Sequence, residues 1–325
     1  MCDNKFDPRF YPEVYQAVAG KDYTVYAYMN DGSVRKFDVK PLIKKGGVFM
    51  FPLCCPKCGL PLKKEGNGCQ CSEGHRYDLA RSGYVNLLLA NGKHSLQPGD
   101  DKRMVRARRL FLEKGYYEPF RRAVCQKALE RLPMERPVVL DAGCGEGYYT
   151  GGLAQALKER GKAPMAAGVD ISKIAADQAA KAHKGIQFAV GSVFHLPVLE
   201  ASCDLAMNLF APLCAGEILR VLKPGGVFLL GVPDRRHLWQ LKQAVYREPY
   251  ENELKEPELP GFSLLEDYPV KDWLLLDNNE DIQNLFQMTP YYYKTSRQDQ
   301  ERAERLETLK TQVEFRVFVY RKQGA

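Results

Sequence analysis

The chain has 325 residues, of which 45% are hydrophobic and 27% charged, so its composition excludes wholesale disorder and a fibrous repeat. No apolar run approaches the roughly 18 residues of a membrane-spanning helix, and the first residues contain no signal-peptide core, so we expect a cytoplasmic protein with no membrane segment. The net charge of +7 divides into +10 for residues 1–131 and −3 for residues 132–325, which leaves open either a surface that binds a polyanion or an ordinary solvated surface.

Composition and hydrophobic patterning divide the chain into four segments. They are a segment with alternating apolar and polar residues (1–50), a cysteine-rich segment (51–92), a basic segment (93–132) and a long segment with α/β patterning (133–325). In the first, two alternating runs flank Asp31 and Gly32, which predicts a β-hairpin because glycine adopts positive φ without steric cost. Two or three strands cannot bury a core of their own, so we expect residues 1–50 to be an accessory element.

The second segment contains five of the ten cysteines, and two pairs of its residues have the spacing of metal ligands. The predicted ligands are Cys55, Cys58, Cys71 and His75. Two tight turns that each hold two soft ligands suit tetrahedral zinc, and four protein ligands leave no open position for catalysis. We therefore predict a structural zinc ion, with reduced buried cysteines as the alternative. Cys54 and Cys69 are further thiols whose spacing fits a zinc site less well.

The third segment is predicted to form basic helices. Asp100 or Asp101 can cap a helix that continues to Gly115. Apolar residues recur at helical spacing between Met104 and Phe111, which predicts a buried face. The opposite face carries a basic stripe of Lys102, Arg106 and Arg109.

The fourth segment alternates short apolar runs with helical stretches, which is the pattern of a parallel sheet covered by helices. One run ends at Asp141 and precedes a glycine-rich turn and a helix that begins near Tyr148, an arrangement that lets a ligand approach the backbone at the positive end of a helix. The turn glycines are Gly143, Gly145 and Gly147. A second run ends at Asp170, where a carboxylate can accept hydrogen bonds from ribose hydroxyls.

Together these features resemble the class I S-adenosylmethionine-dependent methyltransferases over roughly residues 133–325. The resemblance implies a Rossmann-like α/β domain and S-adenosyl-L-methionine as cofactor. A nicotinamide-binding Rossmann domain is the alternative, which the spacing G-x-G-x-G disfavours because dinucleotide-binding domains use G-x-G-x-x-G.

Several strings outside the glycine loop are more distinctive: GYVNLLL, PGDDKRMVRARRLFLEKGYYEPF, VPDRRHLWQLK and QMTPYYY. In this order, after a four-ligand zinc module, they resemble the bacterial 23S ribosomal RNA (guanine-N1)-methyltransferases over about residues 51–325. The resemblance implies a zinc module that recognises RNA, a homodimer, and as substrate a 23S rRNA hairpin near the macrolide-binding site. By position, it also implies that the methyl donor is contacted by Tyr117, Gly145, Glu146 and His237.

Local sequence alone favours a packing role for Tyr117 and an ordinary helix-start role for His237. From the strands and the glycine turn, further donor-binding candidates are Asp141, Gly143, Gly147 and Asp170. Asn208 and Phe210 end the fourth predicted strand, where methyltransferases commonly hold the acceptor base, and residues 288–291 are candidates to complete that pocket. The candidates for phosphate contacts are Arg76, Arg81, Lys102, Arg106 and Arg109.

Two other functions stay open at this point. One is a small-molecule methyltransferase with a structural zinc, which the basic N-terminal part disfavours. The other is a non-catalytic RNA-binding protein, which the intact glycine turn and Asp170 disfavour. Guanine N1 carries a proton, so a base or water must accept it during methyl transfer, and the sequence identifies no residue for this role.

Overall fold

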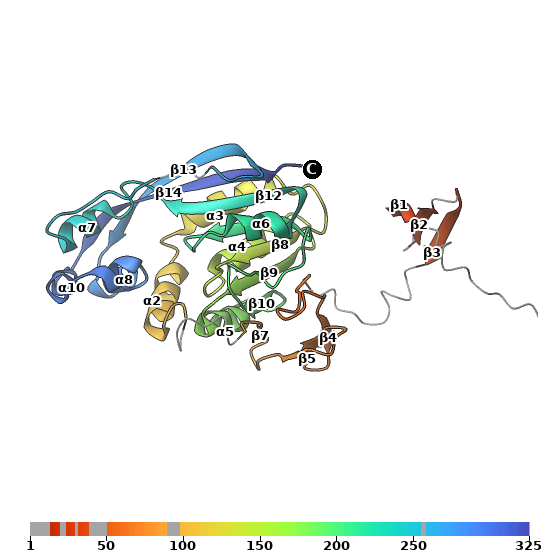
Figure 1. Ribbon diagram of the computed structural model, residues 1–325. Coiled ribbons are helices and arrows are strands. Elements are labelled where there is room, and N and C mark those ends of the chain that lie inside the picture. Colours follow the sequence, from red (N-terminus) through yellow and green to blue (C-terminus); the bar gives the residue numbers. More distant parts are fainter. Residues whose placement is uncertain are drawn as a thin grey trace, which may run out of the picture. The chain divides into compact units, whose positions relative to one another are not determined.

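The computed structural model describes residues 14–19, 24–29, 32–38, 51–89, 98–254 and 258–324, and the chain separates into two compact units, Met1–Phe49 and Met50–Ala325 (Figure 1). In the first unit, an antiparallel sheet has the order β1 (Val14–Ala19), β2 (Thr24–Met29) and β3 (Val34–Asp38). Strands β2 and β3 form the hairpin expected around Gly32, whose φ is +79° and whose amide donates to the carbonyl of Met29. Asp31 lies outside the described residues.

A single eight-stranded sheet organises the second unit, in the order β13-β14-β12-β11-β8-β9-β10-β7 (Figure 1). Its strands are β7 (Val85–Asn86), β8 (Val138–Ala142), β9 (Met165–Asp170), β10 (Gln187–Val190), β11 (Cys203–Leu209), β12 (Leu222–Pro233), β13 (Phe262–Leu276) and β14 (Leu309–Lys322). The strands from β12 to β7 are parallel, whereas β14 pairs antiparallel with both β12 and β13. The predicted Rossmann-like α/β fold is therefore confirmed.

Hydrophobic clusters cover both faces of this sheet. The helices are α2 (Lys102–Glu113), α3 (Glu118–Leu129), α4 (Tyr148–Glu159), α5 (Lys173–Ala182), α6 (Ala215–Val221), α7 (Trp239–Val245), α8 (Asn279–Gln287), α9 (Pro290–Lys294) and α10 (Arg297–Glu304). Along β14, Val317 and Val319 join the cluster that contains Phe111 and Phe120, whereas Phe318 and Tyr320 join the opposite one, as side-chain alternation in a strand requires. None of the helices in the described ranges has both the length and the apolar character to cross a membrane.

The cysteine-rich module is joined to the edge of the main sheet. Its strands β4 (Lys63–Glu65), β5 (Gly68–Gln70) and β6 (Arg76–Asp78) form a small antiparallel sheet, and β7 then pairs in parallel with β10. The amide of Cys54 donates to the carbonyl of Pro197 at 3.0 Å, and the buried side chains of Phe51 and Leu53 belong to the same cluster as Leu140. The module therefore shares a hydrophobic core with the α/β domain.

Helix α2 has the cap and the two faces that its sequence predicts. Oδ1 of Asp101 accepts a hydrogen bond from the amide of Met104 at 2.8 Å, and Gly115 follows the helix with a φ of +79°. The buried residues include Met104, Ala107 and Phe111, and the exposed ones are Lys102, Arg106 and Arg109 among others.

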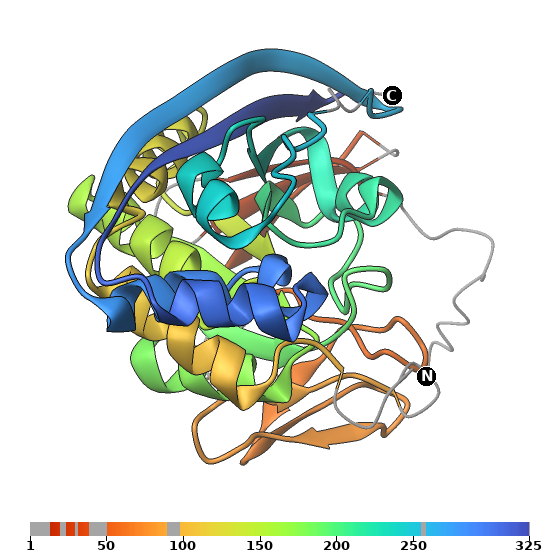
Figure 2. The same ribbon diagram turned by 90° about the vertical axis from the view of Figure 1, so that its left-hand side faces the viewer.

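The buried face of α2 lies against the C-terminal helices, which Figure 2 shows in blue beside the orange-yellow α2. Nζ of Lys114 contacts Oδ1 of Asp281 in α8 at 2.6 Å, and Nε of Arg103 donates to Oε1 of Gln287 at 3.0 Å. The guanidinium of Arg103 also lies 4.8 Å from the ring centre of Tyr292. Helix α2 is therefore an integral part of the second unit rather than a free connection.

Candidate functional site

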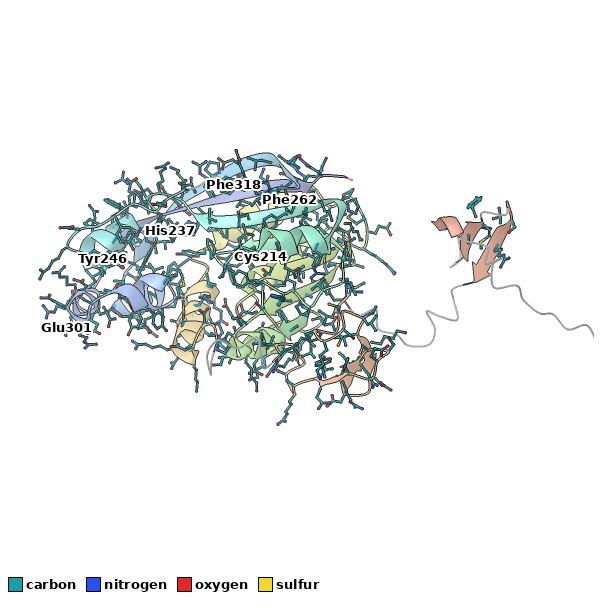
Figure 3. The ribbon with its side chains drawn as sticks, viewed as in Figure 1. Cys214, His237, Tyr246, Phe262, Glu301 and Phe318 are labelled. Atoms are coloured by element: carbon teal, nitrogen blue, oxygen red, sulfur yellow. The ribbon has the colours of Figure 1, made fainter. Side chains whose placement is uncertain are left out.

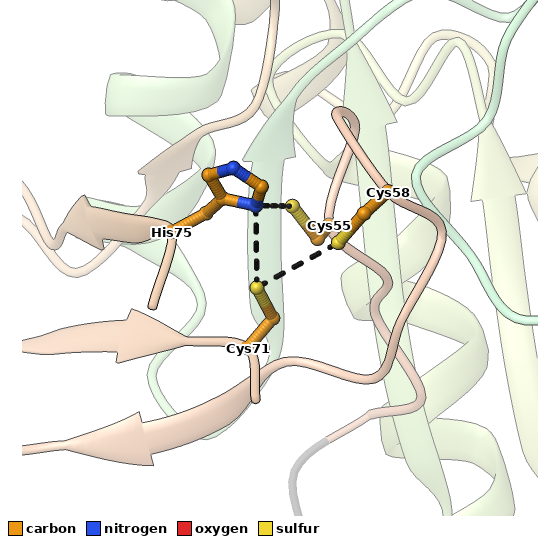
Figure 4. Close-up of side chains that lie close together, drawn as sticks. All are labelled: Cys55, Cys58, Cys71 and His75. Carbon is orange, nitrogen blue, oxygen red and sulfur yellow. Dashed lines mark hydrogen bonds between the residues drawn. The ribbon is translucent and has the colours of Figure 1, made fainter. Parts of the chain in front are cut away.

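The four predicted zinc ligands converge on one point (Figure 4). Their ligand atoms, from Cys55, Cys58, Cys71 and His75, all lie within 4.8 Å of one another. Nδ1 of His75 lies 3.5 Å from the sulfurs of both Cys55 and Cys71, and the sulfurs of Cys58 and Cys71 are 3.7 Å apart. Tetrahedral zinc at ordinary bond lengths separates two sulfur ligands by about 3.8 Å and sulfur from nitrogen by about 3.6 Å. The donor set therefore fits a closed, structural zinc site.

The surroundings of this cluster support metal binding. Gly59 adopts a φ of +73° directly after the second cysteine, and its amide donates to the carbonyl of Cys55 at 2.8 Å, so the backbone folds around the sulfur atoms. The Tyr77 hydroxyl lies 3.2 Å from the Cys55 sulfur and can donate a hydrogen bond to a bound thiolate. Cys54 and Cys69 are buried outside the ligand cluster.

The loop between β8 and α4 is the predicted glycine turn. Gly143, Gly145 and Gly147 have φ values of +90°, +53° and +86°, which favour glycine at all three positions. A Cβ atom at Gly143 would lie 2.3 Å from the Cβ of Ala211, so a side chain there is excluded by the neighbouring loop. A Cβ atom at Gly145 would lie 3.4 Å from a guanidinium nitrogen of Arg108. The loop therefore lies tightly between two other parts of the protein.

Four carboxylates surround this loop: Asp100, Asp141, Glu146 and Asp170. Asp170 holds the loop directly, because its carboxylate accepts hydrogen bonds from the amides of Gly145 at 2.8 Å and Ser172 at 2.7 Å. Oδ2 of Asp141 accepts from the Thr150 hydroxyl at 2.6 Å. Burial raises the pKa of Asp141 to about 7 and the pKa of Glu146 to about 7.

Buried polar atoms without a hydrogen-bond partner collect around the loop. Within the described residues they include Oδ1 of Asp141, Oε2 of Glu146, the hydroxyl of Tyr149 and Oδ1 of Asn208. Each unpartnered buried polar group costs about 1–3 kcal/mol, so their concentration at one place indicates a polar ligand. S-adenosylmethionine, whose ammonium donates hydrogen bonds and whose sulfonium is cationic, fits these acceptors.

Tyr117 and His237 form a buried pair, and Figure 3 labels His237 between β12 and α7. The Tyr117 hydroxyl lies 3.4 Å from Nε2 of His237, and both rings contact Phe315. The amide of Glu314 donates to Nδ1 of His237 at 3.3 Å, so the neutral ring carries its proton on Nε2. Burial lowers the pKa of His237 to about 3, which makes the ring a neutral hydrogen-bond donor. Contact of this pair with the methyl donor stays a prediction.

The acceptor candidates Asn208 and Phe210 lie beside the glycine loop. Nδ2 of Asn208 donates to the carbonyls of Ala142 at 2.9 Å and Pro212 at 3.1 Å, which leaves its Oδ1 as a free acceptor. Phe210 adopts a φ of +59°, a strained conformation for a residue with a side chain, and 41% of its surface is exposed. Its ring contacts three others, those of Phe120, Tyr149 and Phe315.

The remaining candidates occupy the surface or the neighbouring helices. The side chains of Arg76, Arg81, Lys102, Arg106 and Arg109 are all exposed. Two of them have weak surface partners: Arg76 lies 3.7 Å from Asp78, and Arg109 lies 3.2 Å from Glu113. In the segment 288–291, Met288 and Thr289 are buried, Pro290 is exposed and Tyr291 is half-buried. Their contacts with RNA stay predictions.

Arg108 is the residue of this site that sequence analysis missed. Its guanidinium lies 2.5 Å from Asp100 and 4.0 Å from Glu146, next to the glycine loop. Arg108 is spaced by four residues from Met104 and by three from Phe111, which places it on the apolar stripe of α2. A charged residue on the buried stripe of a helix is the signal that could have identified it.

For the zinc site, we expect one zinc ion per chain and its loss in Cys58→Ser, because three ligands bind structural zinc much more weakly than four. Donor binding should persist in this variant, since no donor-binding candidate lies within residues 51–89. Elemental analysis and calorimetric titration measure the two properties. The matched control is Cys54→Ser, which should keep its zinc, and a zinc-loaded Cys58→Ser protein would contradict the assignment.

For the donor site, we expect affinity for S-adenosylmethionine to increase between about pH 6 and about pH 8. Asp141 and Glu146 have raised pKa values of about 7, so they lose their protons over this range and then attract the donor's cationic groups. Calorimetry in buffers of different ionisation enthalpy should detect proton release on binding. Glu146→Gln should reduce this release, whereas Glu159→Gln, an exposed change on α4, should not; equal release in all three proteins would refute the prediction.

Comparison with known proteins agrees with the geometry of both sites. Residues 53–96 match a family model described as the N-terminal region of RlmA, which is a zinc ribbon, and residues 135–287 match a methyltransferase domain model. The zinc-binding module and the S-adenosylmethionine-dependent methyltransferase fold are thereby confirmed.

Full-length relatives extend these matches across most of the chain. The 23S rRNA (guanine(748)-N(1))-methyltransferase of Streptomyces fradiae is 34% identical over 233 residues, which cover 70% of this chain and 81% of the relative. Proposed 23S rRNA (guanine-N(1)-)-methyltransferases of Micromonospora griseorubida and Bacillus subtilis (strain 168) are 35% and 32% identical, and the matched regions cover 58% and 60% of this chain and 68% of each relative. The chain therefore belongs to the family of the 23S rRNA (guanine-N1)-methyltransferases.

Proposed function

We propose that this protein transfers the methyl group of S-adenosylmethionine to N1 of a guanine in a 23S rRNA hairpin near the macrolide-binding site. We call the glycine loop, residues 143–147, the donor loop, and the loop after β11, residues 210–214, the acceptor loop. The observation that carries this proposal is the direct contact between these two loops. Ala211 fills the space beside Gly143, and the side chain of Asn208 binds the carbonyl of Ala142. A base held beside Asn208 therefore lies next to the donor loop. The names of the family members supply the choice of guanine N1.

Phe210 is the proposed platform for the guanine. A base in a folded hairpin must leave its stack before its ring nitrogen can react, and an aromatic side chain in the enzyme replaces the lost stacking. Stacking on an aromatic ring contributes about 1–3 kcal/mol per base. Phe210 is 41% exposed and its ring contacts three other aromatic rings, which suits this role.

Asn208 and His237 are proposed to orient the base and the donor. Two backbone carbonyls engage the amide nitrogen of Asn208, so its Oδ1 can accept a hydrogen bond from a ring N–H or an exocyclic amine of guanine. In the neutral ring of His237, Nδ1 already accepts a hydrogen bond from the Glu314 amide and Nε2 carries the proton. The ring therefore has no free nitrogen to take the guanine proton, and its Nε2–H can only orient a neighbouring acceptor. S-adenosylmethionine supplies the electrophilic methyl group when bound, and positioning by the protein accounts for most of the rate.

The RNA itself is proposed to contact the zinc module, residues 51–92, and the basic helical linker, residues 93–132. The exposed side chains of Arg76 and Arg81 in the module and the basic stripe of α2 support these RNA contacts. Catalysis is assigned to residues 133–325, and residues 1–50 remain an accessory β-hairpin segment in this scheme.

We further propose that the protein is a homodimer in the cytoplasm, where its ribosomal substrate lies. Strand β13 forms one edge of the main sheet and carries exposed apolar side chains, which suit self-association. Trp273 is 54% exposed and Leu275 is 70% exposed on this strand. Light scattering after gel filtration measures the mass of the particle, and a monomer at micromolar concentration would refute the dimer.

The proposed reaction is tested with unmodified 23S rRNA and S-adenosylmethionine, followed by reverse transcription, since a methyl group on guanine N1 blocks base pairing. We expect one new stop at a single guanine. Phe210→Ala should decrease methylation about tenfold or more through lost stacking, whereas Phe210→Tyr should retain most activity. Both variants should bind the donor normally. Methylation of small acceptors without any stop on rRNA would identify a small-molecule enzyme instead.

The basic stripe is tested by salt dependence. Each phosphate contact releases condensed counterions, so rRNA affinity should fall steeply with salt, whereas donor affinity should change little. Replacing Lys102, Arg106 and Arg109 together by Ala should flatten the plot of log affinity against log salt by about one unit per lost contact. The control is Lys158→Ala with Arg160→Ala on the exposed surface at the end of α4, which should leave the slope unchanged. Coinciding slopes for wild type and the triple variant would show that the RNA is held elsewhere.

A further inference from the structure

Arg108 is a largely buried cation on helix α2, and none of the roles proposed above uses it. Its side chain is only 22% exposed, although it belongs to the helix that carries the exposed basic stripe. The exposed stripe and Arg108 lie on different faces of α2, so Arg108 is not positioned to contact phosphates with its neighbours. A buried arginine needs anionic partners, and those partners identify the place it serves.

The guanidinium of Arg108 lies directly beside the middle of the glycine loop. Nη1 is 2.5 Å from Oδ2 of Asp100 and 4.0 Å from Oε2 of Glu146, and it is 3.4 Å from the position of a Cβ atom on Gly145. Nη2 lies 3.5 Å from the carbonyl oxygen of Met288. Arginine presents a fork of N–H donors, and these contacts within the described residues occupy only part of it.

The charge around the loop is strongly unbalanced. Asp100, Asp141, Glu146 and Asp170 contribute four carboxyl groups, and Arg108 is the cation that the structure brings among them. Carboxylates suit the ammonium and sulfonium groups of S-adenosylmethionine but repel the carboxylate at its amino-acid end. That carboxylate therefore requires a positive partner, and arginine binds carboxylates with two parallel hydrogen bonds.

We propose that Arg108 binds the α-carboxylate of the methyl donor and makes the site selective for donors that carry this group. Glu146, whose Oε2 lies unpartnered beside the same guanidinium, then accepts a hydrogen bond from the adjacent ammonium. Two neighbouring side chains of opposite charge thus bind the two charged groups of the donor's amino-acid part: Arg108 binds the carboxylate and Glu146 binds the ammonium. The proposal rests on the proposed function only for the identity of the donor.

A structural role is the competing explanation, because Arg108 also donates a hydrogen bond to Asp100 and lies beside Glu146 of the glycine loop. The two roles differ in one measurable respect. Loss of a structural tie weakens every ligand of the pocket, whereas loss of a carboxylate partner weakens only ligands that possess the carboxylate. S-adenosylmethionine and its decarboxylated analogue, which keeps the sulfonium and the ammonium, form the matched pair of ligands.

The experiment is calorimetric titration of the zinc-loaded, full-length protein with each ligand in the absence of RNA. We expect the wild type to bind S-adenosylmethionine about tenfold or more tightly than the decarboxylated analogue, since a hydrogen-bonded charge pair has this effect. Arg108→Ala should remove this difference by weakening S-adenosylmethionine alone. Arg108→Lys should retain part of it, because lysine keeps the charge but lacks the fork. Arg122→Ala, an exposed change on the neighbouring helix α3, should match the wild type.

Several outcomes would overturn the proposal. They are equal affinity of the wild type for both ligands, an equal loss for both ligands in Arg108→Ala, and no loss in that variant. If Arg108→Ala does not fold, as judged by zinc content and circular dichroism, the wild-type comparison and Arg108→Lys still decide the question. Because RNA is absent, a failure of rRNA methylation does not affect the result, and the two proposals are tested separately.

Discussion

The accumulation of buried carboxyl groups around one backbone loop is the constraint on which the site depends. Burial is the main reason that the pKa values of Asp141 and Glu146 rise to about 7, and the neighbouring carboxylates raise them further. The protein offsets part of this cost with the guanidinium of Arg108 and with amide donors to Asp170. A ligand that brings a sulfonium and an ammonium offsets the rest. In the proposed scheme, the charges around the glycine loop are thus arranged to suit the donor before it binds.

The parallel sheet explains why the loop after β8 and the loop after β11 meet. Strands β8 and β11 are neighbours and run in the same direction, so the loops after them leave the sheet at the same edge. The register pairs Met207 with Asp141, and the next residues, Asn208 and Ala142, are joined by the amide of Asn208. A hydrogen bond between the ends of two neighbouring strands fixes the spacing of the two loops that follow them. Phe210, two residues after Asn208, adopts a positive φ of +59°.

The zinc module is attached to the same frame. Val190 at the end of β10 is paired with Asp170 on one side and with Asn86 of β7 on the other. The last strand of the module is thus two strands away from the carboxylate that holds the glycine loop. Phe51 and Leu53 extend the hydrophobic core of the sheet into the module. In the proposed scheme, the pairing of β7 with β10 and the shared core would hold an RNA segment on the module at a defined distance from the glycine loop.

Local spacing is what made much of this structure predictable. The zinc ligands, the glycine turn, the end of β9 at Asp170 and the cap of α2 at Asp101 each depend on residues close together in the chain. Strand β7 was missed because two residues carry no periodic signal and pair with a strand about a hundred residues away. The antiparallel insertion of β14 between β12 and β13 likewise depends on long-range register.

The roles of individual side chains were harder to predict for a different reason. Arg108 is one of several basic residues of α2, most of which are exposed. Only its helical spacing from Met104 and Phe111 indicates that it lies on the buried face. The tautomer of His237 is fixed by an amide 77 residues further along the chain. The positive φ of Phe210 occurs in a loop whose next residue, Ala211, lies against Gly143 of another loop. Each of these properties is created by tertiary neighbours, so no local pattern in the sequence contains it.

In the proposed reaction, helix α2 connects the donor and the RNA because its two faces carry different basic residues. One face brings Arg108 to the donor loop, and the opposite face exposes the basic stripe to solvent. Both ends of the helix are fixed to the C-terminal helices and their surroundings: Asp101 accepts from the Tyr293 hydroxyl, and Lys114 binds Asp281. Arg108 and the basic stripe belong to one continuous helix, so in the proposed scheme a change in the position of the stripe would be transmitted to Arg108. By linkage, a donor that fixes Arg108 must favour RNA binding by the same factor with which RNA favours donor binding. The proposed scheme therefore places donor binding and RNA binding on one helix, and the reciprocity of their coupling imposes no order of binding.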